Sequence, residues 1–324
     1  MTCQPVFTFS RKTRKTRAES GNSARSTTNG PIRMARLDFR IIGREAGRTR
    51  IGESPCRDPE TGDLWWVDVT GKRLLKRDEA SGAVTDWTMP EETGFVVLVG
   101  PGRPAVGMQT GIFAFDPERG GFERLVAFDK PGFRFNDAAV GADGRLWTSS
   151  MAMDASSSDG EVYRITDDLG LQTIAGGLRI PNGIAVDADR GRLFYSDSDP
   201  RTQTIWTRQP GPGAGEIGNP SVFATTTSLP GRPDGATLDR RGFYWIAGVD
   251  GGAFYVFDTE GALDATIPVP FPAPTKACFS HPDGRSIAVT SKAQGEDGGF
   301  IALADLPDEM EAGIPQPYWR PGGT

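Results

Sequence analysis

The chain has 324 residues, of which 37% are hydrophobic and 24% charged, with 42 glycines, 25 prolines, 18 phenylalanines and a formal net charge of −6. This mixture of turn-forming and large apolar residues argues against a disordered chain and indicates many short strands, and no apolar run approaches the roughly 20 residues of a membrane-spanning helix. A single histidine, His281, excludes a multi-histidine zinc site and leaves only that residue for a Ser-His-Asp triad.

Residues 1–33 differ in charge from the rest of the chain. They carry seven Lys/Arg and one acid, whereas the remainder carries 29 basic and 41 acidic residues. No apolar core follows the basic run, so the segment does not read as a secretory signal. We interpret it as a disordered basic tail, or as the product of an upstream start codon with Met34 as the true start. A nucleic-acid arm is the less favoured alternative, because phosphate would have to approach an acidic body.

From Met34 onward, a turn with Asp and Gly followed by a short apolar run recurs along the chain. Clear copies begin at residues 58, 142, 187, 238 and 281, and a weaker copy begins at residue 100. The turn glycines are Gly62, Gly102, Gly144, Gly191, Gly242 and Gly284, at steps of 40, 42, 47, 51 and 42 residues. A period in the forties with strand-like runs predicts a β-propeller of four-stranded blades. Six copies predict an all-β fold, a single six-bladed propeller over residues 34–324, because one blade alone cannot cover both faces of its sheet.

The first and last repeats indicate how the ring closes. The first repeat holds four strand-like runs, GESPCR, DLWWVDV, RLLKRDE and AVTDWTM, whereas the last holds only SIAVTSK and GGFIALADL after its turn. Residues 35–43 alternate like a strand, and we expect them to complete the last blade and remove its open edge. The glycine-rich segment 211–218 is interpreted as a hairpin insertion, because no βαβ unit surrounds it.

Polar side chains recur eight or nine residues before the turn glycines. They are Glu53, Asn136, Asn182, Asp234 and Lys276, and the weak second copy has Thr93 and Gly94 at this place. Sixfold pseudosymmetry should bring these positions together at one mouth of the central channel. Carboxylate and amide oxygens are hard ligands suited to Ca²⁺, Mg²⁺, Mn²⁺ or Fe²⁺, and Lys276 is a candidate for holding a substrate oxygen. The repeat register therefore predicts a cation site with a polar surround.

The motifs at these positions resemble those of a known family. The succession GESPCRDPETGDLWWVDV, RFNDAAVGADGRLW, RIPNGIAVDADRGRLFYSDS, RPDGATLDRRGFYWIA and PTKACF is similar, over about residues 45–305, to the gluconolactonase/regucalcin (senescence marker protein) family. The resemblance implies a six-bladed propeller that opens sugar lactones with one divalent cation in the channel, which could be Ca²⁺, Zn²⁺, Mn²⁺, Mg²⁺ or Fe²⁺.

The resemblance also implies roles for single residues. Metal ligands correspond to the Glu of GESP, the Asn of PNG and the Asp of PDG, which are Glu53, Asn182 and Asp234. Substrate contacts correspond to the Arg and Asn of RFND and to an acid near SSM, which are Arg134, Asn136 and Asp154.

We therefore expect metal-assisted hydrolysis of a sugar lactone to its aldonic acid, with Asp234 as the general base. Two alternatives stay open, a phosphotriesterase- or arylesterase-like propeller and a non-enzymatic propeller that binds calcium or a protein. The expected partner is a small sugar lactone, with no nucleic acid and no membrane, and the expected state is a monomer or small homo-oligomer. Three dispersed cysteines, Cys3, Cys56 and Cys278, favour a reducing, cytoplasmic location.

Overall fold

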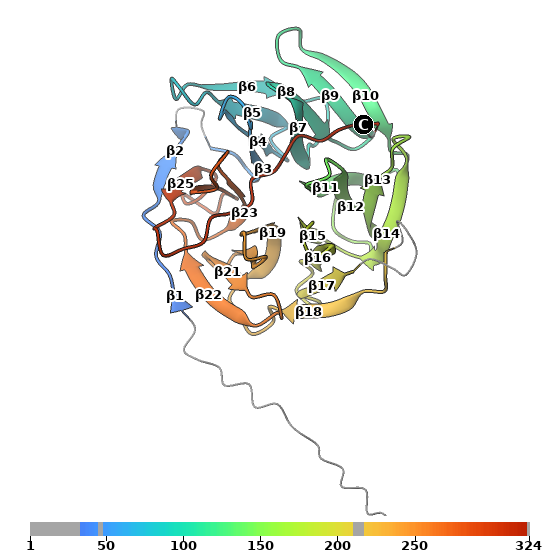
Figure 1. Cartoon of the computed structure of the whole chain (residues 1–324). Helices are drawn as coiled ribbons and strands as arrows, with labels where there is room; N and C mark the ends of the chain where they lie inside the picture. Colours follow the sequence, from blue (N-terminus) through green and yellow to red (C-terminus); the bar gives the residue numbers. More distant parts are fainter. Residues whose placement is uncertain (1–32, 45–47, 210–216, 323–324) are drawn as a thin grey trace, which may run out of the picture. The chain divides into compact units, whose positions relative to one another are not determined.

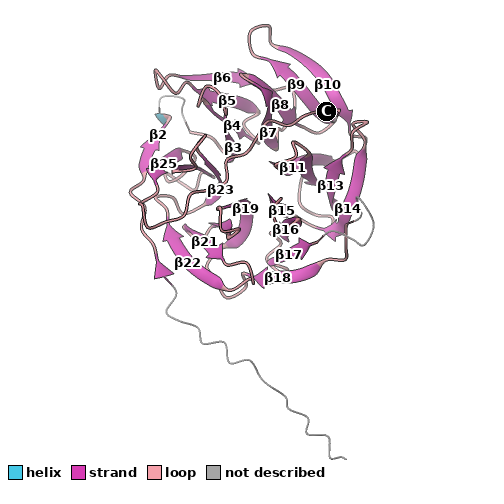
Figure 2. Ribbon diagram, viewed as in Figure 1, coloured by secondary structure: helices cyan, strands magenta, loops and turns pink. Residues whose placement is uncertain are grey.

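A computed structural model describes residues 33–44, 48–209 and 217–322, and these residues form strands and turns without an α-helix (Figure 2). The strands make six sheets, and the first strands of the sheets contact one another in ring order (Figure 1). This arrangement confirms the predicted six-bladed propeller. Within the described ranges, no helix is long and apolar enough to span a membrane.

Each blade holds four antiparallel strands, which follow one another from the inner to the outer edge of the sheet. Blade 1 has β3 (Gly52–Arg57), β4 (Leu64–Asp68), β5 (Arg73–Arg77) and β6 (Val84–Thr88), and blade 2 has β7 (Phe95–Gly100), β8 (Arg103–Gly107), β9 (Gly111–Asp116) and β10 (Gly121–Ala127). Blade 3 has β11 (Phe133–Val140), β12 (Leu146–Ala152), β13 (Gly160–Ile165) and β14 (Leu171–Leu178), and blade 4 has β15 (Pro181–Asp187), β16 (Arg192–Asp197), β17 (Thr204–Arg208) and β18 (Ser221–Thr225). Blade 5 has β19 (Arg232–Leu238), β20 (Tyr244–Val249), β21 (Ala253–Phe257) and β22 (Leu263–Pro268), and blade 6 has β23 (Pro274–Phe279), β24 (Ser286–Ser291), β25 (Ile301–Asp305) and β2 (Arg40–Ile42).

The N-terminal strand closes the ring as predicted. Strand β2 pairs antiparallel with β25, with Arg40 opposite Leu303, so the last blade gains its outer strand from the start of the chain. A further strand, β1 (Arg33–Met34), was not anticipated; it lies parallel to β22 on the edge of blade 5 and starts one residue before the expected domain boundary. The other residues of the 1–33 segment lie outside the described ranges, as do residues 210–216 of the glycine-rich connection between β17 and β18.

The six turn glycines share one backbone conformation. All have a positive φ, between 61° at Gly102 and 81° at Gly242, which is the left-handed region that residues with a Cβ avoid. Each closes the turn between the first and second strands of its blade. This requirement explains why the repeat is most regular at glycine.

The hydrophobic core is divided into six clusters, each between two adjacent blades. Successive side chains of a strand point to opposite faces of its sheet. Trp65 therefore packs with Val96 of blade 2, whereas its neighbour Trp66 packs with Ala288 of blade 6. Since both faces of a blade are covered, the second strands are buried almost throughout their length.

The two ends of the central channel differ in structure. We call the end at which the inner strands begin the entry end, and the end at which they run into the turn glycines the turn end. The C-terminal segment 312–320 crosses the turn end (Figure 1): the Ile314 amide donates to Leu238 O at 2.9 Å, and the Trp319 amide donates to Leu98 O at 2.7 Å. These bonds join blade 5 to blade 2 across the turn end of the channel.

Candidate metal and substrate site

The polar positions found from the repeat share a structural cause. Five inner strands carry a shift in pairing register at the same place, and in β7 of blade 2 the shift lies later, between Leu98 and Gly100. A bulge re-aims the side chains next to it and is frequent beside active sites. The residues within or directly beside these five bulges include Glu53, Asn136, Asn182, Asp234 and Lys276.

At this register position blade 2 has Gly94 and the buried Thr93, whose hydroxyl donates to Glu91 O at 3.3 Å. A Cβ on Gly94 would lie 2.1 Å from Phe135 O, so a larger residue could not fit between blades 2 and 3. The same loop supplies Glu92 instead, and its Oε2 lies 3.4 Å from Nε of Arg134. The repeat analysis missed Glu92, which precedes the equivalent position.

Asn182 and Asp234 are brought into direct contact. Asn182 Nδ2 donates to Asp234 Oδ1 at 2.6 Å and to Ser198 Oγ at 3.2 Å, and both residues are buried. These bonds hold the amide nitrogen toward Asp234 and Ser198, so the amide oxygen points away from both residues. No described residue donates a hydrogen bond to Asn182 Oδ1 or to Asp234 Oδ2.

Without a bound cation, the charged forms of the two candidate carboxylates, Glu53 and Asp234, are disfavoured. Burial, and next the negative charge of Asp137, raise the pKa of Glu53 from 4.5 to about 7. Burial, and next the charge of Glu53, raise the pKa of Asp234 well above its usual value. Since burial and then neighbouring negative charge both disfavour the charged carboxylates, a cation between the two groups would lower both pKa values.

The residues fit a hard divalent cation. Within the described ranges, no three His, Cys, Asp or Glu side chains are arranged to hold a metal ion, so such an ion would depend on two carboxylates and an amide. Glu53 Oε2 accepts the Ser54 amide at 2.9 Å, and no described donor reaches Glu53 Oε1. This oxygen, Asn182 Oδ1 and Asp234 Oδ2 are the hard donors that Ca²⁺, Mg²⁺ and Mn²⁺ prefer.

The expected substrate-binding pair lies beside this cluster. Arg134 Nη1 donates to Asn136 Oδ1 at 2.6 Å and to Phe135 O at 3.0 Å, and Asn136 Nδ2 donates to Pro181 O at 3.0 Å. Burial lowers the pKa of Arg134, and the nearby Glu92 opposes that change. The Asn136 amide thus links the guanidinium of blade 3 to the start of β15.

Asp154 is separate from the other candidates. It is exposed in the loop after β12, where its Oδ1 accepts the Ser156 amide at 2.9 Å. The described contacts include none between Asp154 and the cluster. Its loop follows Ala152, which pairs with Phe133 at the entry end, and a sugar contact from Asp154 stays a prediction.

Lys276 contacts a residue that the sequence analysis missed. Its ammonium nitrogen lies 2.5 Å from Oδ1 of Asp137, the Asp of RFND, and both side chains are buried. The register count passed over Asp137 because it selected Asn136, one residue earlier. The Asp in that motif was the available signal.

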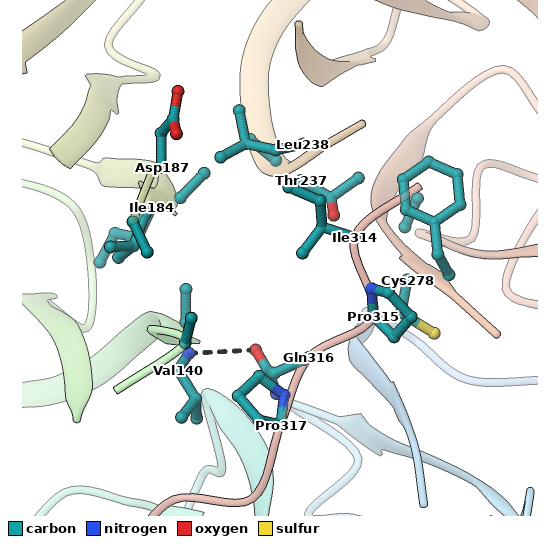
Figure 3. A pocket seen from close by; sticks show the side chains of 18 of the residues that line it. Val140, Ile184, Asp187, Thr237, Leu238, Cys278, Ile314, Pro315, Gln316 and Pro317 are labelled. Carbon is teal, nitrogen blue, oxygen red and sulfur yellow. Dashed lines mark hydrogen bonds between the residues drawn. The ribbon is translucent and has the colours of Figure 1, made fainter. Parts of the chain in front are cut away.

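A cavity of about 470 Å³ occupies the turn end of the channel (Figure 3). Its walls include Ile184, Leu238, Ile314 and Pro317, and Gln316 Oε1 accepts the Val140 amide at 3.2 Å. Of the five register residues only Lys276 reaches its lining. The cavity is therefore not the candidate site, which lies toward the entry end.

His281 belongs to the turn end as well. Its Nε2 is 2.8 Å from Gln316 O and therefore carries the proton of that hydrogen bond. The histidine is thus tied to the C-terminal segment.

Comparison with known proteins agrees with these motifs. Residues 51–293 match the SMP-30/Gluconolactonase/LRE-like region. A 6-deoxy-6-sulfogluconolactonase of Pseudomonas putida is 31% identical over 79% of this chain and 88% of its own length, and pentonolactonase XacC of Haloferax volcanii is 29% identical over 77% and 84%. The crystal structure of a calcium-binding protein, regucalcin, from Agrobacterium tumefaciens superposes with a TM-score of 0.79 at 24% identity, covering 88% of this chain and 98% of that one. At 24% identity, the similarity to the regucalcin crystal structure supports the six-bladed propeller fold.

Proposed function

Because this chain belongs to the SMP-30/gluconolactonase/LRE-like family, we propose that it hydrolyses a sugar lactone to the aldonic acid with the help of one divalent cation held by Glu53, Asn182 and Asp234. Two relatives carry the names of sugar lactonases, which supports a cyclic ester of a sugar acid as the substrate class.

The observation that carries the metal part of the proposal is the set of three unpaired oxygens. Asn182 turns its Nδ2 toward Asp234 and Ser198, leaving its oxygen free beside a carboxylate of raised pKa. The amide oxygen of a buried residue usually accepts a hydrogen bond. Asn182 is buried, no described residue donates to its oxygen, and a cation would use that oxygen as a ligand.

Each residue then has a definable part in the reaction. When bound, the cation would polarise the lactone carbonyl and stabilise the negative charge that develops on its oxygen. Asp234 accepts the proton that water releases as its oxygen bonds to the carbonyl carbon, on the carboxylate oxygen that the ion leaves free. The ring C–O bond then breaks and the proton passes to the ring oxygen, so that water is added across the ester. Glu53 and Asn182 hold the ion.

Arg134 is suited to orient the sugar. Its Nη1 and Nε face Asn136, Phe135 and Glu92, whereas no described residue accepts a hydrogen bond from Nη2. Two N–H groups are therefore available to hydroxyl oxygens of a substrate at the entry end. Asn136 fixes the guanidinium and thereby the direction of these donors.

The test is a pH-indicator assay with a panel of aldonolactones, aryl esters and organophosphates, with and without a chelator. The proposal predicts chelator-sensitive acid release from at least one aldonolactone. Faster turnover of aryl esters or organophosphates would favour the arylesterase- or phosphotriesterase-like alternative. Calcium binding without turnover of any of them would favour the non-enzymatic propeller.

We also propose a reducing, cytoplasmic location for the protein. Cys56 and Cys278 are buried free thiols, which supports that location.

A further inference from the structure

A buried ion pair crosses the channel from one side of the ring to the other. Lys276 lies on β23 of blade 6 and Asp137 on β11 of blade 3, three blades away in ring order. The ammonium nitrogen is 2.5 Å from Asp137 Oδ1 and 2.6 Å from Ala138 O, and the two side chains are only 7% and 3% exposed. Lys276 also lines the cavity at the turn end.

The path of the lysine side chain is fitted to the candidate site. Lys276 passes over Gly235, the residue that follows Asp234 in the bulge of β19. A Cβ on Gly235 would lie 2.6 Å from both Cβ and Cγ of Lys276, which no real side chain could tolerate. The glycine of the RPDG motif thus leaves the space through which Lys276 reaches Asp137.

Asp137 is engaged on both of its oxygens. Besides Lys276, Oδ1 accepts the Ala138 amide at 2.8 Å, and Oδ2 accepts the Ile184 amide at 2.7 Å. The Ile184 bond fixes the bulge of β15 two residues after Asn182. In contrast, the oxygens proposed as ligands on Glu53 and Asp234 accept no hydrogen bond from the described residues.

We propose that Lys276 is a positioning residue that, through Asp137, sets the charge of the cation site. Glu53 and Asp234 supply two negative charges to the ion, and Asp137 would supply a third if it were not neutralised. By pairing with Asp137, Lys276 keeps this carboxylate from the ion and directs it to the backbone that presents Asn182. A third carboxylate would bind the cation more tightly and weaken its pull on the lactone carbonyl. The inference rests on the proposed function.

The test is a four-cornered set of variants whose Mn²⁺ affinity is measured by calorimetry in the absence of any lactone. Lys276→Met leaves one extra negative charge and should tighten Mn²⁺ binding by about tenfold or more. Asp137→Asn leaves one extra positive charge and should weaken binding by a similar factor. The double variant has the charge of the wild type and should return to within about threefold of its affinity. In the lactone assay, Lys276→Met should lower kcat at least about tenfold with KM nearly unchanged.

A control and the contrary outcomes complete the experiment. Lys76, whose Nζ lies 3.2 Å from Asp63 Oδ2 in blade 1, offers a matched lysine–aspartate pair away from the cluster; Lys76→Met should leave Mn²⁺ affinity unchanged. If Lys276 were merely structural, Lys276→Met and the double variant would both bind Mn²⁺ more weakly and melt earlier, which overturns the inference.

If Lys276→Met does not fold, the Mn²⁺ affinities of Asp137→Asn and the double variant are compared instead. The inference predicts that the double variant binds Mn²⁺ more tightly, and equal affinities overturn it. Wild-type protein that neither binds Mn²⁺ nor opens a lactone refutes the proposed function and the inference together. If the wild type binds Mn²⁺ but Lys276→Met, Asp137→Asn and the double variant all bind it as tightly as the wild type does, the inference alone is refuted.

Discussion

Replacing Asp234 with asparagine removes one negative charge and the candidate general base while keeping the size of the side chain. Asp234 Oδ1 accepts a hydrogen bond from Asn182 Nδ2 at 2.6 Å, and the amide oxygen of an asparagine can accept the same bond. A hydrogen bond to a charged group contributes about 1.5–3 kcal/mol and a neutral one about 0.5–1.5, so the variant loses about 1 kcal/mol there. It also relieves the burial of a carboxylate beside Glu53. We therefore expect the Tm of the metal-free variant within about 3 °C of the wild type.

The effect on turnover should be far larger. Loss of a general base lowers kcat by about 10²–10⁴, which corresponds to about 2.7–5.5 kcal/mol in the activation free energy. The assay follows acid release from an aldonolactone at saturating Mn²⁺, with kcat and KM determined separately and the fold checked by circular dichroism. The predicted result is a native spectrum and melting curve with turnover reduced at least about a hundredfold.

Asp143 provides the matched control. It is an exposed aspartate in a turn of blade 3, with its Oδ2 3.2 Å from Arg145 Nη1, and Asp143→Asn makes the same chemical change outside the register of the bulges. Its kinetics should equal those of the wild type. Equal losses at Asp143 and Asp234 would refute the register argument, and an Asp234→Asn variant that fails to fold would show that the role of Asp234 is structural.

Further predictions concern the ion, the pH dependence and the N-terminal tail. Asn182→Asp adds a charge at the ion and should tighten Mn²⁺ in a calorimetric titration while lowering kcat less than Asp234→Asn does; weaker binding would contradict the ligand role. In metal-free protein, burial raises the pKa of Glu53 from 4.5 to about 7, so between these values the folded state binds more protons than the unfolded chain. The free energy of unfolding should therefore fall, by about 3 kcal/mol from this group, as the pH rises through that window; urea titrations that show no such slope would contradict it. Mn²⁺ at about 100 times its Kd should raise the free energy of unfolding at neutral pH by about 2.7 kcal/mol, and an unchanged urea midpoint would argue against binding to the folded state. A chain that starts at Met34 should keep its Tm and activity, because the described pairings it loses are those of Arg33 with β22, and a large loss of either would show that the tail has a structural role.

The sequence predicted the fold because its repeat reflects a strict backbone requirement. All six turn glycines have positive φ, so the glycine spacing survives where the surrounding side chains vary. The closing strand β2 was predictable because residues 35–43 alternate and the last repeat lacked a run of its own. The two residues of β1 carry no such pattern, because their pairing with β22 uses only backbone groups.

The sequence predicted which positions form the candidate site. It predicted fewer of the contacts that the side chains at and beside these positions make. Counting back from the turn glycines found the five bulged strands, because the distance from bulge to turn is nearly constant. It could not show that Asp137 lies between Lys276 and Ile184, since these contacts join blades far apart in the sequence. Glu92 was missed for a related reason: it pairs with Arg134 from a loop whose register position holds Thr93 and Gly94, one and two residues after it.

The most direct test of the proposed reaction is a titration of metal-depleted protein with Mn²⁺ while lactone hydrolysis is followed. We expect no enzymatic turnover before metal is added, a linear rise in rate, and a plateau once one ion is bound per chain. Full turnover in protein shown by elemental analysis to be free of metal would contradict metal-assisted hydrolysis, as would a rate that does not respond to the added ion.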